Sequence, residues 1–502
     1  MTSNTKKSAY NIFFGVVCQI VIALVGILIP RMFITSFGSE VNGFLSSINQ
    51  IFTYIVLLEA GVGTATLQAL YKPVAKDDWN EINGIMSATA QFYRRTGWCY
   101  LACVVLLAIV YPIFIHSEIP VWQQVAVILI VGGSGSIGYF IHGKYRMLLR
   151  ADGKTYVYTN ASTLVQLGTN ITKIVMIALG LNIVFVQLGH MLLTLALALY
   201  IRWYTKRHYR NLNLNASPNK AAIAQKNSVL IHEISQMVFN HTDVFLLTVF
   251  TDLKVVSVYV IYNTVVEIIS TLIGNIHNGF SFRLGQLYNT DEARYVQTYD
   301  IYETCYMMLS MALYCVTYIF LLPFMRLYTS GIEDANYLDK WLPILFVSIK
   351  LLVSGRALAG ATITYAGKFK ETRNRAIIEM CINLVVSVVC VNLLGIYGVL
   401  IGTLAALLYR ANDMIIFTRK RVLGQSPWKT YAKWVVNLIV FVVIVFLSNR
   451  LFPINADNFF SLILYAIGYL IMVFALYGIA NALVFHKHFS KILHLLKKQI
   501  HK

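Results

Sequence analysis

Apolar residues in this chain form long continuous blocks that are separated by short polar segments. A run of roughly 18 to 25 apolar residues is long enough to cross the hydrocarbon core of a bilayer as an α-helix. Because the runs are continuous and do not alternate with polar residues, they exclude a β-barrel. The pattern predicts an all-α polytopic membrane protein of about fourteen spans, at residues 10–34, 43–69, 97–115, 120–141, 157–179, 181–201, 229–250, 255–279, 301–322, 343–364, 377–394, 396–417, 432–452 and 459–484.

Short sequence matches recur along the chain at an almost constant distance. Residues 34–37 (ITSF) match 247–250 (LTVF) at an offset of 213. A common offset across several regions indicates an internal duplication, here of a unit with six spans. Because six is even, the two copies point the same way and form parallel repeats. Further matches at 213 or 214 join Ile48-Asn49 to Tyr262-Asn263, Gly153-Lys154 to Gly367-Lys368, Asn170 to Asn383, and Gly189 to Gly402.

The duplication predicts the domain organisation. Two six-helix lobes are joined by a polar cytoplasmic linker, and two additional helices follow the second lobe. The final residues are basic, with apolar residues at helical spacing, and are expected to lie on the inner membrane face. The predicted boundaries are 8–205 for the first lobe, 206–228 for the linker, 229–418 for the second lobe, 419–485 for the additional helices and 486–502 for the tail.

Composition supports the membrane assignment and sets an orientation. The chain is 58% hydrophobic and 13% charged, with a mean hydropathy of +0.65, whereas about a quarter of a soluble protein's residues are charged. The net charge of +19 comes mainly from the loops and the two terminal segments on one side, which hold 33 of the 41 Lys and Arg residues, against four on the other side. The positive-inside rule therefore predicts a cytoplasmic-membrane protein with both termini in the cytoplasm.

Motifs for catalysis, metals or nucleotides are absent or incomplete. Residues 138–144 (GYFIHGK) have the spacing of a P-loop, but Tyr145 replaces the required Ser or Thr and the segment ends a span. His232-Glu233 lacks the second His of a zinc motif, and the seven cysteines have no metal-ligand spacing. No enzyme activity, cofactor, metal or nucleic-acid partner is expected.

The informative residues are charges inside the predicted spans. Each costs roughly 2.5–3.5 kcal/mol at the bilayer centre, so such groups usually line a cavity or form a pair. The cations are the candidate substrate-binding residues, and the acids are candidates for ion coupling or structural ion pairs. The cations are Arg31, Lys173, Lys350 and Arg356, and the acids are Glu59, Asp243 and Glu267.

The depth of each charge decides which interpretations stay open. Arg31, Lys173 and Lys350 lie in outer halves of spans, from which a long side chain can reach the interface. Arg356 and Asp243 lie too deep for this, so both a buried ion pair and a substrate or ion role remain open. Since the Asp243 span copies the Arg31 span, these two residues are expected at similar heights.

Several stretches resemble a known family. They are IPRMFITSFG (29–38), LEAGVGTA (58–65), LYKPVA (70–75), NHTD (240–243) and LGIYGVLIGT (394–403). In this order and at these spacings, the chain resembles the polysaccharide-unit (O-antigen or capsule, Wzx-type) flippases of the MOP superfamily. The resemblance implies two six-helix lobes in a V around a central cavity, with two extra helices as in the lipid II flippase branch.

The resemblance also implies a function, namely outward transport of undecaprenyl-diphosphate-linked oligosaccharide by alternating access, for surface polysaccharide biosynthesis. Arginine suits a diphosphate because its planar fork donates two hydrogen bonds to phosphate oxygens. The membrane potential, negative inside, drives an anion outward by about 2.3 kcal/mol per charge per 100 mV. The implied partners are the lipid-linked oligosaccharide, membrane lipids, H⁺ or Na⁺ as coupling ion, and the polysaccharide polymerase machinery around a monomeric flippase.

Two other classes remain open. A multidrug or cation antiporter of the same superfamily would have the same fold, but it would favour acids in its cavity, whereas the intramembrane cations here outnumber the acids by four to three. A membrane glycan polymerase or ligase would need a large outer loop for its active site. The longest outer loop predicted here, 325–341, has 17 residues.

Overall fold

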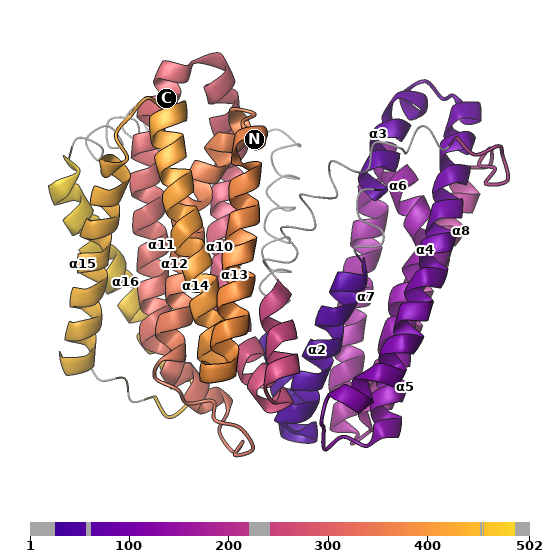
Figure 1. The fold of residues 1–502 in the computed structure, drawn as a ribbon, viewed down its shortest axis with the longest axis horizontal. Coiled ribbons are helices and arrows are strands. Elements are labelled where there is room, and N and C mark those ends of the chain that lie inside the picture. Colours follow the sequence, from indigo (N-terminus) through magenta and orange to yellow (C-terminus); the bar gives the residue numbers. More distant parts are fainter. Residues whose placement is uncertain (1–25, 57–61, 220–240, 452–453, 455, 487–502) are drawn as a thin grey trace. The chain divides into compact units, whose positions relative to one another are not determined.

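The computed structural model describes residues 26–56, 62–219, 241–451, 454 and 456–486, and all regular structure in these ranges is helical (Figure 1). The chain divides into two compact units, Met1–Ser257 and Val258–Lys502. Each unit is described by itself below. The beginning of the first predicted span, Glu59 and the predicted basic tail after residue 486 lie outside the described residues. The predicted lobe boundaries stay a prediction.

The first unit is built from consecutive helices joined by short turns. Two short apolar helices, Gly26–Phe37 and His241–Phe250, belong to it, and a π-helical turn joins α5 to α6. The other elements are α2 (Ser39–Ile55), α3 (Val62–Ala75), α4 (Trp79–Phe114), α5 (Val121–Ile137), η2 (Gly138–His142), α6 (Gly143–Ala151), α7 (Thr155–Ala178) and α8 (Ile183–His208).

The second unit contains almost all of α10 and every later helix. Its last two helices, α15 and α16, both pack against α11. Its elements are α10 (Leu253–Thr290), α11 (Glu292–Tyr328), α12 (Leu342–Tyr365), α13 (Phe369–Leu394), α14 (Ile396–Phe417), η4 (Thr418–Val422), α15 (Trp428–Leu451) and α16 (Phe459–Val484).

Ten helices in the described part of the chain are long and apolar enough to cross a membrane. The chain is therefore an all-α, multi-pass membrane protein. The two short apolar helices coincide with the described parts of the predicted spans 10–34 and 229–250. α7, with 24 residues, matches the predicted span 157–179 but is not among the ten. The predicted total of fourteen spans stays a prediction.

Several helices begin earlier than the apolar runs predict. The segments 70–95 and 283–298 were expected as loops, but α4 begins at Trp79 and α11 at Glu292. Both starts are fixed by an aspartate cap, because Asp78 accepts hydrogen bonds from the backbone of Asn80 and Glu81, and Asp291 accepts one from Arg294. The apolar run marks only the part of a helix that suits the hydrocarbon core.

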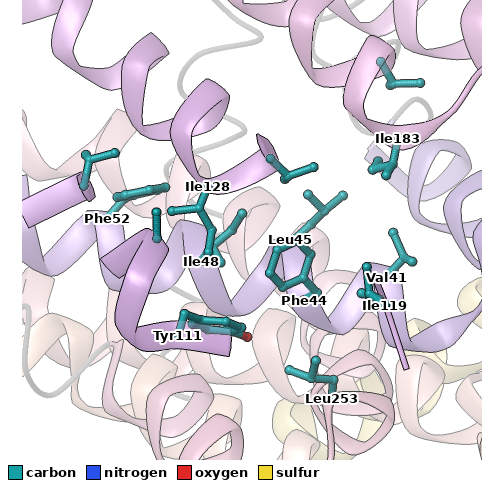
Figure 2. Packing of buried hydrophobic residues seen from close by; sticks show 14 of the residues in the cluster. Val41, Phe44, Leu45, Ile48, Phe52, Tyr111, Ile119, Ile128, Ile183 and Leu253 are labelled. Atoms are coloured by element: carbon teal, nitrogen blue, oxygen red, sulfur yellow. The ribbon is translucent and has the colours of Figure 1, made fainter. Parts of the chain in front are cut away.

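The core of the first unit gathers around α2 (Figure 2). Ile48 and Phe44 are almost fully buried, and Phe44 meets the ring of Tyr111 edge-on with 5.5 Å between ring centroids. The Tyr111 hydroxyl donates a hydrogen bond of 3.0 Å to Ser47. Leu253, the first residue of α10, is buried in the same cluster. The beginning of α10 is therefore part of this core.

Small residues allow helices α13 and α14 to pack closely. A Cβ atom at Gly398 would overlap the carbonyl of Cys390, and one at Gly402 would overlap Ser387. The two glycines are four residues apart and share one face of α14, which is the small-residue spacing that brings membrane helices together. The close approach lets Asn383 of α13 donate a hydrogen bond of 2.9 Å to Thr403.

Matched positions of the sequence repeat adopt the same turn. Gly153 has φ +69° and Gly367 has φ +64°. In both turns the following lysine N–H bonds to the carbonyl five residues earlier, from Lys154 at 2.8 Å and from Lys368 at 3.1 Å. This is the Schellman ending, which needs a residue in the left-handed region and so favours glycine. The Gly-Lys match therefore encodes the end of one helix and the start of the next in both units.

Candidate functional site

Three of the charged residues predicted in the first half of the chain lie on helices of the first unit. Arg31 is on the short helix Gly26–Phe37 and Lys173 is on α7, and both are partly buried. Asp243 is buried, with 7% of its surface exposed. Its helix packs on α2, where the hydroxyl groups of Thr242 and Tyr54 lie 3.2 Å apart. The pairing of Arg31 with Asp243 stays a prediction.

Lys350 and Glu267 are brought together in the second unit. The Lys350 ammonium of α12 forms an ion pair with the Glu267 carboxylate of α10. The lysine side chain is 15% exposed and the glutamate side chain 52%. A candidate substrate cation thus has a candidate coupling acid as its partner, so each neutralises the other. Lys350 is less available to an anion than its sequence position alone implies.

Arg356 lies in a buried polar network between three helices. Its guanidinium forms an ion pair with Glu379 of α13, and the other carboxylate oxygen of Glu379 lies 3.3 Å from Nε of Arg410 on α14. Glu379 is 6% exposed and Arg410 is 4% exposed. The three side chains are therefore held together inside the unit.

The network continues along α14. Arg410 donates to Asp413 at 2.8 Å, and Asp413 also pairs with Arg375 of α13. The five residues carry three positive and two negative charges, and the extra cation, Arg375, has a side chain that is 38% exposed. The network is not complete, because the Arg410 Nε atom is buried without a well-aligned hydrogen bond among the described residues.

A second buried network connects α15 and the turn η4 to α11. Arg419, in the π-helical turn η4, is fully buried, and its guanidinium lies 4.6 Å from the ring of Tyr299. It pairs with Asp300 at 2.6 Å and with Glu303, both from α11. Lys433 of α15 reaches Glu303 at 2.6 Å. The predicted spans 396–417 and 432–452 leave Arg419 in a loop, but it is buried in a helical turn.

All three guanidinium nitrogens of Arg419 have partners. The Nε atom donates to Thr430 at 2.9 Å, and the two terminal nitrogens donate to Asp300, Gln425 and Glu303. Four of its five N–H donors are therefore used within the protein, which leaves little capacity for a ligand. We therefore assign this network to structure, as the connection between α11, η4 and α15.

A third polar cluster lies outside the spans of the first unit, at the turn between α6 and α7. The Tyr209 hydroxyl donates to Asp152 at 2.5 Å, and Lys154 pairs with the same carboxylate at 2.8 Å. Partial burial alone would raise the pKa of Asp152, but these two hydrogen bonds outweigh it and lower the pKa. Burial and the carboxylate raise the pKa of Tyr209. The cluster fastens residue 209 to this turn.

Sequence reasoning did not find Glu379, Arg410, Asp413, Asp300 or Glu303. One signal was available, because Arg410 and Asp413 are three residues apart and so share a face of a helix. The ion pairs between different helices have no such signal in the sequence. They depend on which helices are neighbours, and the apolar pattern does not predict which helices pack together.

The fold that these helices form in this order is similar to that of solved membrane transporters. No protein-family model and no curated protein sequence matches the chain. The likeness is to solved structures. One is titled "Lipid II flippase MurJ, inward closed conformation", with a TM-score of 0.73, 13% sequence identity, and coverage of 95% of this chain and 99% of that chain.

Multidrug transporters with this fold match over a shorter part of the chain. An inward-facing MATE family transporter of the MOP superfamily has a TM-score of 0.64 at 15% identity, covering 81% of this chain and 98% of that chain. The MATE multidrug transporter DinF-BH has a TM-score of 0.56 at 12% identity, covering 81% of this chain and 94% of that chain. At these identities, the likeness establishes the fold alone.

Proposed function

We propose that the chain is a flippase that moves undecaprenyl-diphosphate-linked oligosaccharide from the inner to the outer leaflet of the cytoplasmic membrane. The observation that carries the proposal is the extent of the likeness. The lipid II flippase structure covers 95% of this chain and the multidrug transporters cover 81%. The difference, 14% of 502 residues, is about the length of the predicted additional segment 419–485. A likeness of this extent favours a lipid-linked substrate over a drug.

The network around Arg356 supports an anionic substrate. The Arg410 Nε atom lies 3.3 Å from the Glu379 carboxylate without a well-aligned hydrogen bond, so a better-placed incoming acceptor would stabilise the protein. Diphosphate oxygens are strong acceptors, and guanidinium groups bind them with two parallel hydrogen bonds. We propose that Arg356 and Arg410 together contact the diphosphate, with Glu379 holding both side chains in position.

The remaining predicted residues take different roles in the proposal. Arg31 and Lys173 are proposed as further substrate cations, from the first unit. The Lys350–Glu267 pair is proposed as a structural or coupling pair, because the partners already neutralise each other. Asp243 is proposed as the carrier of a coupling proton or Na⁺, since it is buried in the first unit. A dianionic headgroup that moves outward would gain roughly 2.3 kcal/mol per charge per 100 mV from the membrane potential, which sums to several kcal/mol. Transport would then not require ATP.

The second candidate is a multidrug antiporter, favoured by the likeness to the MATE structures. The two functions differ in the substrate's charge and in the phenotype that they give a cell. An antiporter would confer resistance to cationic dyes on a host without its own pumps. A flippase would instead restore surface glycan in a host without its own flippase.

The experiment that tests the flippase proposal measures lipid-linked glycan on the inner leaflet of such a host. Arg356→Ala should lower export about ten- to a hundredfold, since one charge-assisted contact contributes roughly 1.5–3 kcal/mol. Arg356→Lys should restore part of the export, because it keeps the charge and loses the planar fork. Arg326→Ala, at the end of α11, is the control, with protein levels compared by blot. Normal export by a well-expressed Arg356→Ala protein would show that the headgroup is held elsewhere.

A further inference from the structure

The first unit contains a small cavity beside the π-helical turn η2. Its volume is about 140 Å³, and its polar side chains are those of Tyr93, Tyr139, His142 and Arg146. With about 30 Å³ for each liquid water, the cavity has the space of four to five water molecules. That is far below the roughly 300–1,000 Å³ of a pocket for a drug-sized ligand. The cavity therefore suits one small polar group.

The sequence explains how the cavity stays open. It includes Gly135, Gly138 and Gly143 in its wall, and a Cβ atom at Gly143 would lie 2.5 Å from the ring of Tyr93. The π-helical turn Gly138–His142 widens the helix at this point, and π-helical turns of this kind are frequent at functional sites. These are the residues whose spacing resembles a P-loop, although they lie on a membrane helix.

One polar atom in the wall has no partner in the described part of the chain. His142 is 8% exposed, and its Nδ1 atom is buried. This atom forms no hydrogen bond with the described residues. Its ring stacks on Tyr158, which also carries the Arg146 guanidinium at 5.2 Å from the ring centroid. A buried polar atom that has no partner marks a place for a ligand atom or an ordered water.

The charged groups described around the cavity are cations, and no acid is among the described residues that line it. Lys144 lies within electrostatic reach of Arg94 on α4 and of Arg202 on α8. Among the described residues, none of these four cations (Lys144, Arg94, Arg202 and Arg146) takes part in an ion pair. Three helices therefore contribute unpaired positive charge to one end of the unit, and such a field concentrates anions.

We propose that this cavity binds a phosphoryl group, with the Arg146 guanidinium and a His142 ring N–H as donors. The proposal deepens the proposed flippase function and rests on it for the identity of the substrate. In that function, the cavity is a further binding site for the diphosphate of the lipid-linked oligosaccharide, occupied at another stage of transport than the network around Arg356. Its volume admits a phosphoryl group and leaves the glycan and the lipid outside.

A cysteine in the cavity wall provides a local test with inorganic pyrophosphate as the probe. Val56 lines the cavity and is 43% exposed. The Val56→Cys protein, with the seven native cysteines replaced, is purified in detergent, and its reaction rate with a maleimide is measured against pyrophosphate concentration. Pyrophosphate should slow the reaction, whereas sodium chloride at the same ionic strength should not. Protection at this position reports the cavity and not the network around Arg356. An unchanged rate overturns the proposal.

Three variants distinguish binding by specific residues of the cavity from general attraction to a basic surface. Arg146→Gln should raise the half-protecting pyrophosphate concentration at least tenfold. Arg150→Gln, one turn further along α6, removes one positive charge outside the cavity. It should change the half-protecting pyrophosphate concentration less than twofold. Gly138→Ala adds a methyl group to the cavity wall at an ordinary 3.7 Å from His142, so it should fold and weaken protection without changing the charge. Equal effects of Arg146→Gln and Arg150→Gln would overturn the site.

A transport assay in the flippase-deficient host distinguishes the site from the function. Loss of glycan export in the Arg146→Gln protein, with normal export in Arg150→Gln, supports the substrate role. Normal export in Arg146→Gln together with lost protection overturns the substrate role. If the wild-type chain exports no lipid-linked glycan and pyrophosphate still protects Val56→Cys, the flippase proposal is wrong and the phosphoryl site remains.

Discussion

Removing the Glu379 carboxylate is the most direct perturbation of the network around Arg356. This carboxylate pairs with Arg356 through one oxygen and lies 3.3 Å from Arg410 through the other. Gln keeps the size of the side chain and loses the charge. Arg410 would keep Asp413, at 2.8 Å, but Arg356 would lose its ion pair with Glu379. Breaking one side of a buried ion pair costs about 3–5 kcal/mol.

This cost is large enough to measure as a melting temperature. For units of 150–250 residues, 1 kcal/mol shifts the melting temperature by roughly 2–4 °C, so Glu379→Gln should melt about 6–20 °C below the wild type. Melting is followed in detergent by fluorescence-detected size exclusion. Glu371→Gln is the matched control on the same helix, because its pair with Lys368 at 3.7 Å is exposed. An exposed pair contributes about 0–1 kcal/mol, so the control should shift by less than about 4 °C.

One result would refute this reasoning. If Glu379→Gln and Glu371→Gln melt at the same temperature, Glu379 is not holding two arginines inside the protein. A double variant adds a second test. Replacing both Glu379 and Arg356 by neutral residues of similar size should recover a good part of the lost stability, because the unpaired buried charge is then gone.

Three further predictions concern other parts of the chain. Glu303→Gln should speed trypsin cleavage in the segment 419–429, which has basic residues at 419, 420, 421 and 429, because Arg419 and Lys433 lose their shared carboxylate; equal cleavage rates in the variant and the wild type would contradict this. Gly402→Ala should destabilise the packing of α13 on α14, while Gly360→Ala, with its nearest atom at 3.8 Å, should not; equal melting temperatures would show that the helices separate easily. An impermeant thiol reagent should modify Gly331→Cys from outside and Ser217→Cys only after permeabilisation, and the reverse pattern would refute the predicted orientation.

The apolar pattern predicts where the membrane helices lie, because an uninterrupted apolar run has no other stable place than a bilayer. It does not predict where they begin. α4 and α11 continue well beyond their apolar parts, and the aspartates at 78 and 291 that cap them are the only local signal. The Gly-Lys match of the repeat predicted that the two regions share a structural feature, but it did not predict which one. The structure shows that the shared feature is the same helix-ending turn at Gly153 and Gly367.

The site was predictable in one respect. Arg356 stood out because a charge at that depth needs a partner or a cavity, and the structure provides a partner in Glu379. The identity of that partner was not predictable, because the two residues belong to different helices and nothing in their spacing connects them. Arg419 was misread for a related reason. A basic stretch after a span is typical of a loop, and only three-dimensional contacts distinguish a buried arginine from a solvated one.

The two networks of the second unit differ in a way that separates structure from function. Around Arg419 every guanidinium nitrogen donates to an acceptor, so binding a ligand there would break existing hydrogen bonds. Around Arg410 the Nε atom is buried, and although Glu379 lies 3.3 Å away, no well-aligned hydrogen bond forms in the described residues. A protein that gained only stability from this network would lose free energy by leaving such a donor unmatched. An acceptor that arrives and departs, such as a diphosphate oxygen, would find a donor there, and we therefore propose the network around Arg356, besides the cavity beside η2, as a place where a transported anion binds.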